Sequence, residues 1–240
     1  MKAKRIIIIG ASSGIGKEMA LIYAKKGCTL GITGRRKDLL EELKNQFPGQ
    51  ISISVFDVMG SNNQVEIKQL IEKLGGLDLL IYNSGYGDIS RNLDWQIENA
   101  TTRTNVNGFV EITVSAFNFF IQKGEGQIAL TSSVAGIRGN SWAPAYSASK
   151  AFMSNYAEGL NIKATKMKKK VIITDIRPGF VNTKMAKGNG QFWVSTPEKA
   201  ARQMVMGIER KKRVVYITRR WRLVAWILRN LPYFLYKRLA

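Results

Sequence analysis

Tyr146 and Lys150, four residues apart in "AYSASKAF", are the side chains in this chain best suited to proton transfer. The chain contains no histidine, the residue that most often carries protons near neutral pH. Residues at this spacing project from the same face of a helix. A fixed ammonium group favours the phenolate, so we expect Lys150 to lower the pKa of Tyr146 and make it a usable general acid. The alternative is that the pair forms one turn of a surface helix.

Alternating strand and helix patterns must position this pair. Short β-branched runs that read as strands lie at residues 5–10, 28–33, 51–57, 77–83, 126–133, 170–178 and 213–218. The first four runs and the sixth are uniformly apolar, which predicts burial on both faces. Helical patterns lie at 14–26, 37–47, 63–74, 97–122, 145–168 and 197–210. The alternation predicts one α/β domain, a doubly wound parallel sheet of about seven strands with helices on both faces.

A glycine-rich turn, "GASSGIG", follows the first strand and opens the first helix. Its glycines, Gly10, Gly14 and Gly16, let phosphates approach the backbone at a helix N-terminus. The second strand ends in Arg35 and Arg36, where a carboxylate would accept hydrogen bonds from the ribose of NAD. Guanidinium groups suit a phosphate instead, so the sequence predicts NADP(H) rather than NAD(H). The alternative is that both arginines only begin a solvated helix.

Seven motifs in order resemble the short-chain dehydrogenase/reductase family up to about Thr218. After the glycine loop come "FDV", "YNSG", "NVNG", a serine pair, "YSASK" and "RPGFVNT". The resemblance implies a Rossmann-type fold and hydride transfer with a nicotinamide coenzyme. Two positions depart from the family pattern: Ile9 replaces a threonine and Tyr82 replaces an asparagine. Both put local hydrogen bonding in question.

The resemblance also implies residue roles. Tyr146 protonates the substrate oxygen, Ser133 donates a hydrogen bond to it, Lys150 tunes Tyr146 and binds the nicotinamide ribose, and Asn105 holds a water that links Lys150 to solvent. The implied coenzyme-binding residues are Gly10, Ser12, Ser13, Gly14, Ile15, Gly16, Arg35, Arg36, Asp57, Val58, Asn83, Ser84, Gly85, Tyr146, Lys150, Pro178, Gly179, Val181 and Thr183.

The residues that the resemblance places around the substrate are mostly apolar or aromatic. They are Tyr86, Ile89, Val134, Trp142, Phe180, Met185, Phe192 and Trp193. They suggest NADPH-dependent reduction of a lipophilic carbonyl substrate to an alcohol, although such residues are also ordinary core material. Relatives pair through the two long helices, here 97–122 and 145–168, so we expect a homodimer or homotetramer.

The charge of the chain is concentrated near its end. Lysine and arginine number 37 against 17 acidic residues, a net charge of +20, and ten of the basic residues lie in Arg210–Ala240 with no acid among them. We therefore separate a domain at 1–218 from a basic amphipathic C-terminal extension at 219–240. Its tryptophans and arginines predict a helix lying on an anionic membrane surface. Docking on its own domain or a partner subunit, or contact with an acidic partner, are the alternatives.

Other classes of protein fit less well. No apolar run reaches the roughly 20 residues of a membrane span, and Cys28 is the only cysteine, so the sequence predicts a cytoplasmic protein, either free or peripheral at the inner face of a membrane. No histidine or cysteine cluster predicts a metal site. The basic residues do not form a nucleic-acid reading motif, so we expect no nucleic-acid partner. A non-catalytic NADP-binding sensor or scaffold protein remains the alternative function.

Overall fold

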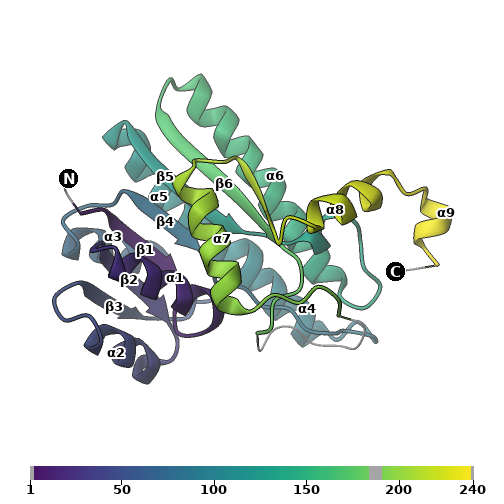
Figure 1. Cartoon of the computed structure of the whole chain (residues 1–240), viewed down its shortest axis with the longest axis horizontal. Coiled ribbons are helices and arrows are strands. Elements are labelled where there is room, and N and C mark those ends of the chain that lie inside the picture. Colours follow the sequence, from purple (N-terminus) through teal and green to yellow (C-terminus); the bar gives the residue numbers. More distant parts are fainter. Residues whose placement is uncertain (1–2, 184–190, 239–240) are drawn as a thin grey trace.

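The computed structural model describes residues 3–183 and 191–238 and has the predicted Rossmann-type architecture (Figure 1). One parallel sheet runs in the order β3-β2-β1-β4-β5-β6-β7. Its strands are β1 Arg5–Ile9, β2 Thr29–Gly34, β3 Ile51–Val55, β4 Leu79–Tyr82, β5 Glu125–Thr131, β6 Lys170–Pro178 and β7 Val214–Ile217. The strand order reverses between β1 and β4, and a crevice for a ligand opens at such a point.

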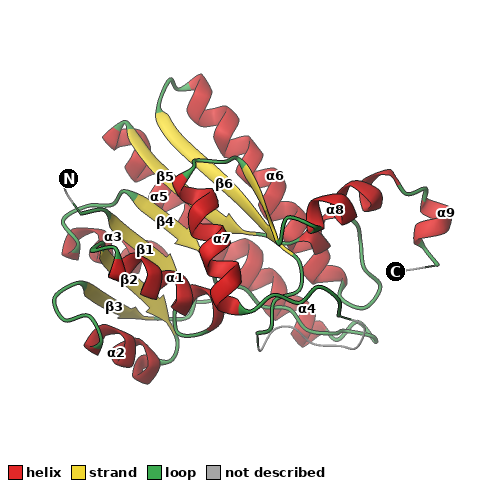
Figure 2. Ribbon diagram, in the orientation of Figure 1, coloured by secondary structure: helices red, strands yellow, loops and turns green. Residues whose placement is uncertain are grey.

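Helices cover both faces of the sheet (Figure 2). On one face lie α1 Gly14–Lys25, α2 Lys37–Asn45 and α7 Pro197–Glu209; on the other lie α3 Asn63–Lys73, α5 Phe109–Lys123 and α6 Pro144–Lys166. Successive residues of β1 face opposite sides, so Ile6 and Ile8 enter the first core while Ile7 and Ile9 enter the second. The uniformly apolar first strand is therefore buried on both faces, as predicted.

The predicted helix over 97–122 is not continuous. It begins as α4, Trp95–Thr102, and the carboxylate of Asp94 caps it by accepting a 2.8 Å hydrogen bond from the backbone of Gln96. A π-helical turn, Arg103–Gly108, then separates α4 from α5. Such a turn changes the helical phase by one residue, which apolar spacing alone does not reveal.

The predicted burial of the third strand is wrong. β3 is the edge of the sheet, and its last residue, Val55, is 42% exposed. The sequence did not predict burial on both faces for the fifth strand. This strand is nevertheless buried from Gln127 to Thr131, because β4 and β6 flank it. Position in the sheet, rather than apolar content, decides burial here.

The C-terminal extension forms α8, Trp221–Asn230, and the short α9, Tyr233–Tyr236, beside the β7 end of the sheet (Figure 1). Arg138 donates hydrogen bonds to the carbonyl oxygens of Leu228 at 3.2 Å and Leu231 at 3.0 Å, where α8 ends. The Tyr236 hydroxyl donates to the carbonyl oxygen of Gly139 at 2.5 Å. These contacts hold the extension on its own domain.

The two faces of α8 differ. Trp221 and Ala225 are buried against the domain, whereas Leu223 is 59% exposed and Trp226 is 64% exposed. The predicted amphipathic helix is present. Its contact with the domain buries Trp221 and Ala225 but leaves the apolar Leu223 and Trp226 exposed. No helix in the described part of the chain has the length and apolar content to cross a membrane.

Candidate active site

The carboxyl ends of six neighbouring strands lie along one edge of the sheet and carry the predicted site residues. The residues that follow β1 to β6 in turn include Gly10, Arg35, Asp57, Asn83, Ser133 and Gly179. The topology therefore brings together motifs that are far apart in the sequence.

The glycine loop has the shape of a phosphate-binding turn. Gly10 has φ +83°, and a Cβ there would lie 2.8 Å from the Ser84 backbone. A Cβ at Gly16 would lie 2.0 Å from the Gly10 carbonyl oxygen. Ser13 precedes α1 without a side-chain cap, so the first N–H groups of the helix are open to a ligand. Thr183 approaches from the far side, 3.5 Å from the position of a Cβ at Gly14.

Two arginines lie beside this loop. Arg36 donates to the hydroxyl oxygens of Ser12 at 2.8 Å and Ser13 at 2.6 Å. Arg35 lies 3.5 Å from the Asp57 carboxylate, and the two side chains are 68% and 38% exposed. Both arginines follow β2, at the strand end where a carboxylate would accept hydrogen bonds from the ribose of NAD.

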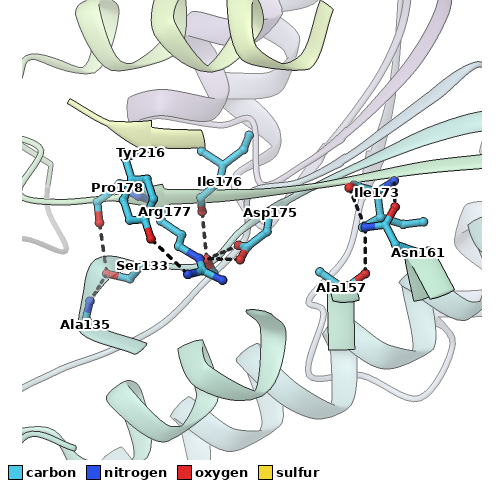
Figure 3. Close-up of polar contacts among 11 residues, drawn as sticks. Ser133, Ala135, Ala157, Asn161, Ile173, Asp175, Ile176, Arg177, Pro178 and Tyr216 are labelled. Atoms are coloured by element: carbon cyan, nitrogen blue, oxygen red, sulfur yellow. Dashed lines mark hydrogen bonds and ion pairs between the residues drawn. The ribbon is translucent and has the colours of Figure 1, made fainter. Parts of the chain in front are cut away.

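Ser133 and Tyr146 meet at the end of β5. Ser133 precedes a short 3-10 turn, Val134–Ile137; its hydroxyl accepts from the backbone of Ala135 at 3.1 Å and donates to the carbonyl oxygen of Pro178 at 3.3 Å (Figure 3). The Ser133 hydroxyl also lies close enough to the Tyr146 phenol to lower its pKa. The two predicted hydroxyl groups are therefore neighbours.

Lys150 lies beneath the tyrosine ring, with its Nζ atom 5.7 Å from the ring centre. Lys150 is 3% exposed, and its ammonium group donates to the carbonyl oxygen of Thr131 at 2.9 Å. Burial lowers the pKa of Lys150 to about 8, against the opposing effect of the Asp175 carboxylate.

The predicted fall in the Tyr146 pKa is wrong. Burial raises this pKa, and the hydrogen bond from Ser133 offsets only part of the rise. Desolvation of the phenolate is the largest cause, and the Lys150 ammonium group is directed at Thr131 and lies by the ring rather than at the phenol hydroxyl.

Asn105 lies in the π-helical turn and is fully buried. Its amide accepts from the backbone N–H of Tyr86 at 2.9 Å and donates to the Tyr86 carbonyl oxygen at 2.7 Å and to Ser149 Oγ at 3.0 Å. Both N–H donors of the amide are thus used within the protein. The side chain ties the loop after β4 to the helix that carries Tyr146.

One of the two departures from the family pattern, Tyr82, has a clear consequence, and Asn83 beside it keeps a bracing role. Tyr82 is buried, and its hydroxyl donates to the carbonyl oxygen of Thr104 at 2.8 Å, which anchors the π-helical turn beside Asn105. Asn83 donates to the Gly10 carbonyl oxygen and accepts from Thr131, each at 3.3 Å. Asn83 therefore braces the ends of three strands.

Phe180, Phe192 and Trp193 form one aromatic cluster, and its centre is Trp221. Ring centres lie 5.5 Å from Trp221 for Phe180, 5.0 Å for Phe192 and 6.2 Å for Trp193. Sequence reasoning assigned Trp221 to the extension alone and missed this contact. Gly179 has no room for a side chain beneath this ring, because a Cβ there would lie 1.9 Å from it, but the sequence alone does not indicate the contact.

Other predicted residues have different surroundings. Trp142 is 45% exposed under the Arg91 guanidinium group, 4.2 Å from its ring centre, and makes no ring contact with the aromatic cluster. Val134 and Val181 are buried, and Ile15 packs on the core. Met185 lies outside the described residues. The side chains whose placement is ordinary core packing are Ile15, Val58, Val134 and Val181.

A polar network behind Ser133 was also missed. Ser132 donates to the Asp175 carboxylate, which also accepts from Arg177 Nε at 2.6 Å; Arg177 Nη1 donates to the Tyr216 hydroxyl at 3.3 Å (Figure 3). The Arg177 and Asp175 side chains are 13% and 4% exposed. An aspartate and an arginine two residues apart on a strand share a face, which was the available signal.

Comparison with known proteins agrees with this geometry. A sequence model described as short chain dehydrogenase matches residues 4–192. An uncharacterized oxidoreductase of Myxococcus xanthus is 31% identical over 79% of this chain and 76% of its own length. A hydroxysteroid 11-beta-dehydrogenase 1-like protein of Xenopus laevis is 28% identical over 85% of this chain and 74% of its own length.

Solved structures are similar as well. A short chain dehydrogenase from Bacillus anthracis has a TM-score of 0.79 and 27% identity, with 89% of this chain and 94% of that chain covered. The open helix N-terminus, the glycine turn and the neighbouring arginines fit a dinucleotide. The chain therefore belongs to the short-chain dehydrogenase family of NAD(P)-dependent oxidoreductases.

Proposed function

We propose that this protein reduces a lipophilic carbonyl compound to an alcohol, with NADPH as the coenzyme. The observation that carries the proposal is that Ser133 and the buried Lys150 both neighbour Tyr146, at the edge that also holds the glycine loop. Two neighbouring hydroxyl groups suit the negative oxygen that forms as a carbonyl is reduced, provided that Ser133 turns its proton from the Pro178 carbonyl oxygen to the substrate.

Each side chain has a defined task. NADPH, bound by the glycine loop and the strand ends, supplies the hydride. Tyr146 donates its phenolic proton to the substrate oxygen, and Ser133 donates a second hydrogen bond. Burial that raises the Tyr146 pKa keeps the phenol protonated before reaction. Lys150 stabilises the phenolate that remains and binds the ribose of the coenzyme.

Asn105 acts as a positioning residue. Because its amide joins the Tyr86 backbone to Ser149, it fixes the loop after β4 against the helix that carries Tyr146. Its carbonyl oxygen has one further lone pair, where a water that returns protons to Lys150 would bind.

The preference for NADPH rests on the basic groups at the end of β2. Arg36 is already oriented by Ser12 and Ser13, and the exposed Arg35 can leave Asp57 for a stronger partner. A phosphate on the adenosine ribose would receive charge-assisted hydrogen bonds from both. The end of β2 carries arginine in place of the carboxylate that would accept from the 2′-hydroxyl of NAD, and the nearby Asp57 carboxylate is paired with Arg35.

The lipophilic substrate is supported by the aromatic cluster of Phe180, Phe192, Trp193 and Trp221 beside the Pro178–Gly179 segment. Such a surface favours apolar ring or chain compounds over free sugars. The Xenopus relative is named as a hydroxysteroid dehydrogenase-like protein, which supports the same class.

The test compares Tyr146→Phe with wild type across a panel of ketones from short sugars to long-chain and steroid-like compounds. We expect NADPH oxidation with the lipophilic members, a loss of roughly 10²- to 10⁴-fold in Tyr146→Phe, and unchanged NADPH binding. Tyr156→Phe, which removes another hydroxyl from the same helix, is the control. Full turnover in Tyr146→Phe would refute the assignment. Wild-type protein that binds NADPH but reduces nothing would favour the sensor or scaffold.

The same proposal includes two expectations about partners. Leu223, Trp226 and Ile227 are exposed on α8 among arginines, which supports peripheral contact with an anionic membrane surface. Phe152 and Ile162 are exposed on α6, which supports pairing of two copies along this helix. Vesicle co-sedimentation of Trp226→Ser tests the first, and light scattering of Ile162→Glu tests the second.

A further inference from the structure

We infer that a second site, in a polar cavity between α6, the β6–β7 edge and α8, binds a phosphate-bearing anion. The cavity has a volume of about 520 Å³. That volume lies within the roughly 300–1,000 Å³ typical of small-molecule sites. Its charged lining residues are Glu158, Asp175, Arg177, Arg213, Arg222 and Arg229.

Arg177 is the best-fixed cation in the cavity. Its Nε donates to Asp175 at 2.6 Å and its Nη1 donates to the Tyr216 hydroxyl at 3.3 Å (Figure 3). The Asp175 charge is thereby matched. The Nη2 group of Arg177 has no hydrogen-bond partner among residues 3–183 and 191–238, so it remains available to a ligand that enters the cavity.

The other cations are not matched. Arg213, Arg222 and Arg229 form no ion pair within the described ranges, and neither does the single remaining acid, Glu158. These groups leave two net positive charges. A phosphate monoester carries a charge of about −1.5 to −2 at neutral pH, and guanidinium groups bind it through paired hydrogen bonds.

The positions of these arginines allow several of them to contact the same ligand. Arg222 and Arg229 are seven residues apart on α8 and share a helix face. Arg213 comes from the turn before β7, so the guanidinium groups approach from two elements. A smaller hollow of about 200 Å³ shares Arg177 and Arg229 with the cavity.

This cavity is distinct from the coenzyme site. Arg35 and Arg36 follow β2, whereas the cavity adjoins β6 and β7, at the opposite end of the strand order. The smaller hollow reaches Gly136 and Ile137 in the turn that Ser133 begins. An anion bound here would lie behind the catalytic edge rather than on it.

The phosphate could belong to a soluble ester or to a phospholipid headgroup, because both present the same chemistry. The exposed Leu223, Trp226 and Ile227 on α8 would bring a membrane close to Arg222 and Arg229. The experiment therefore has two arms, one with pyrophosphate and one with phosphatidylcholine vesicles with or without phosphatidic acid.

Titration calorimetry with pyrophosphate uses protein carrying Arg35→Gln and Arg36→Gln, which removes the two arginines of the coenzyme site. The glycine loop can still bind pyrophosphate in every variant, so the difference between variants, rather than binding by the parent alone, reports on the cavity. In this background we compare Arg213→Gln/Arg229→Gln with Lys199→Gln/Lys212→Gln, a control that removes the same charge from exposed residues outside the cavity. We expect the arginine pair to weaken binding by at least roughly 10-fold, since each charge-assisted hydrogen bond is worth at least about that factor. The lysine pair should have little effect.

Vesicle co-sedimentation uses the same variants. Selective loss of pyrophosphate binding supports the site with a soluble ligand, and selective loss of phosphatidic-acid-dependent sedimentation supports it with a lipid ligand. Failure of the parent protein to bind either probe would overturn the inference. Equal losses in the arginine and lysine pairs in both arms would overturn it too, because general charge attraction would then explain the binding.

Discussion

Two arginine–aspartate pairs lie near opposite ends of the sheet and differ mainly in burial. Arg35 and Asp57, beyond β2 and β3, are 3.5 Å apart with side chains 68% and 38% exposed. Arg177 and Asp175, on β6, are 2.6 Å apart with side chains 13% and 4% exposed. An exposed pair contributes about 0–1 kcal/mol, whereas removing one partner of a buried pair costs about 3–5 kcal/mol. The first pair can therefore exchange partners when a ligand arrives, and the second is a fixed structural contact.

The largest effect should come from breaking the buried pair. Arg177→Met leaves the Asp175 carboxylate buried with only Ser132 as a side-chain donor, so we expect the free energy of unfolding to fall by about 3–5 kcal/mol. Urea denaturation followed by circular dichroism measures it. A loss below about 1 kcal/mol would mean that this pair behaves like an exposed one.

A substitution at the coenzyme end of the sheet should change coenzyme specificity rather than stability. Arg36→Gln removes a charged donor from the expected phosphate position, so kcat/KM with NADPH should fall roughly 10- to 100-fold while kcat/KM with NADH changes little. Lys37→Gln, its exposed neighbour, is the matched control. Equal losses with both coenzymes would show that Arg36 only supports the glycine loop through Ser12 and Ser13.

Lys150 offers a pH test of the buried end. Its pKa is about 8 in the folded protein against 10.5 ordinarily, so between these values the unfolded chain binds more protons. Stability should therefore rise from pH 8 toward pH 10.5, on the order of 1 kcal/mol per pH unit. The difference in unfolding free energy between wild type and Lys150→Met, measured at several pH values, isolates this slope. A difference that does not vary with pH would contradict the lowered pKa.

The smallest effect should come from the exposed pair. Arg35→Met removes a solvated contact, and we expect a stability loss below about 1 kcal/mol in the same urea assay. Added salt should shrink it further, because screening is strong between exposed charges. A cost near that of Arg177→Met would remove the contrast between the two ends.

The order of motifs predicted most of the coenzyme end, because glycine turns and strand ends are local features that a parallel topology brings together. The seven strands, the reversal between β1 and β4, and the meeting of Ser133 with Tyr146 all follow from it. What could not be predicted depends on burial. The raised Tyr146 pKa and the half-exposed β3 reflect depth within the fold, which no residue pattern reports.

The C-terminal half of the chain was harder to predict, because its contacts join segments that are far apart in the sequence. Trp221 is separated from Phe180 by about forty residues of sequence, and the Asp175–Arg177 pair gained meaning only once Ser132 and Tyr216 were seen beside it. The π-helical turn at Asn105 could not be predicted because it is a local irregularity. It changes the phase by one residue within an otherwise helical pattern. Contacts between distant segments and small irregularities are the features that spacing does not encode.

The contact between Gly179 and Trp221 has a practical consequence for anyone who shortens this chain. Trp221 is only 5% exposed and covers a glycine that has no room for a side chain. Truncation after residue 218 would remove Trp221. Phe180 would lose the ring that packs on it, and the three aromatic rings would lose their central neighbour. Single substitutions on the outward side of α8, such as Trp226→Ser, separate what the extension does for its surroundings from what it does for its own domain.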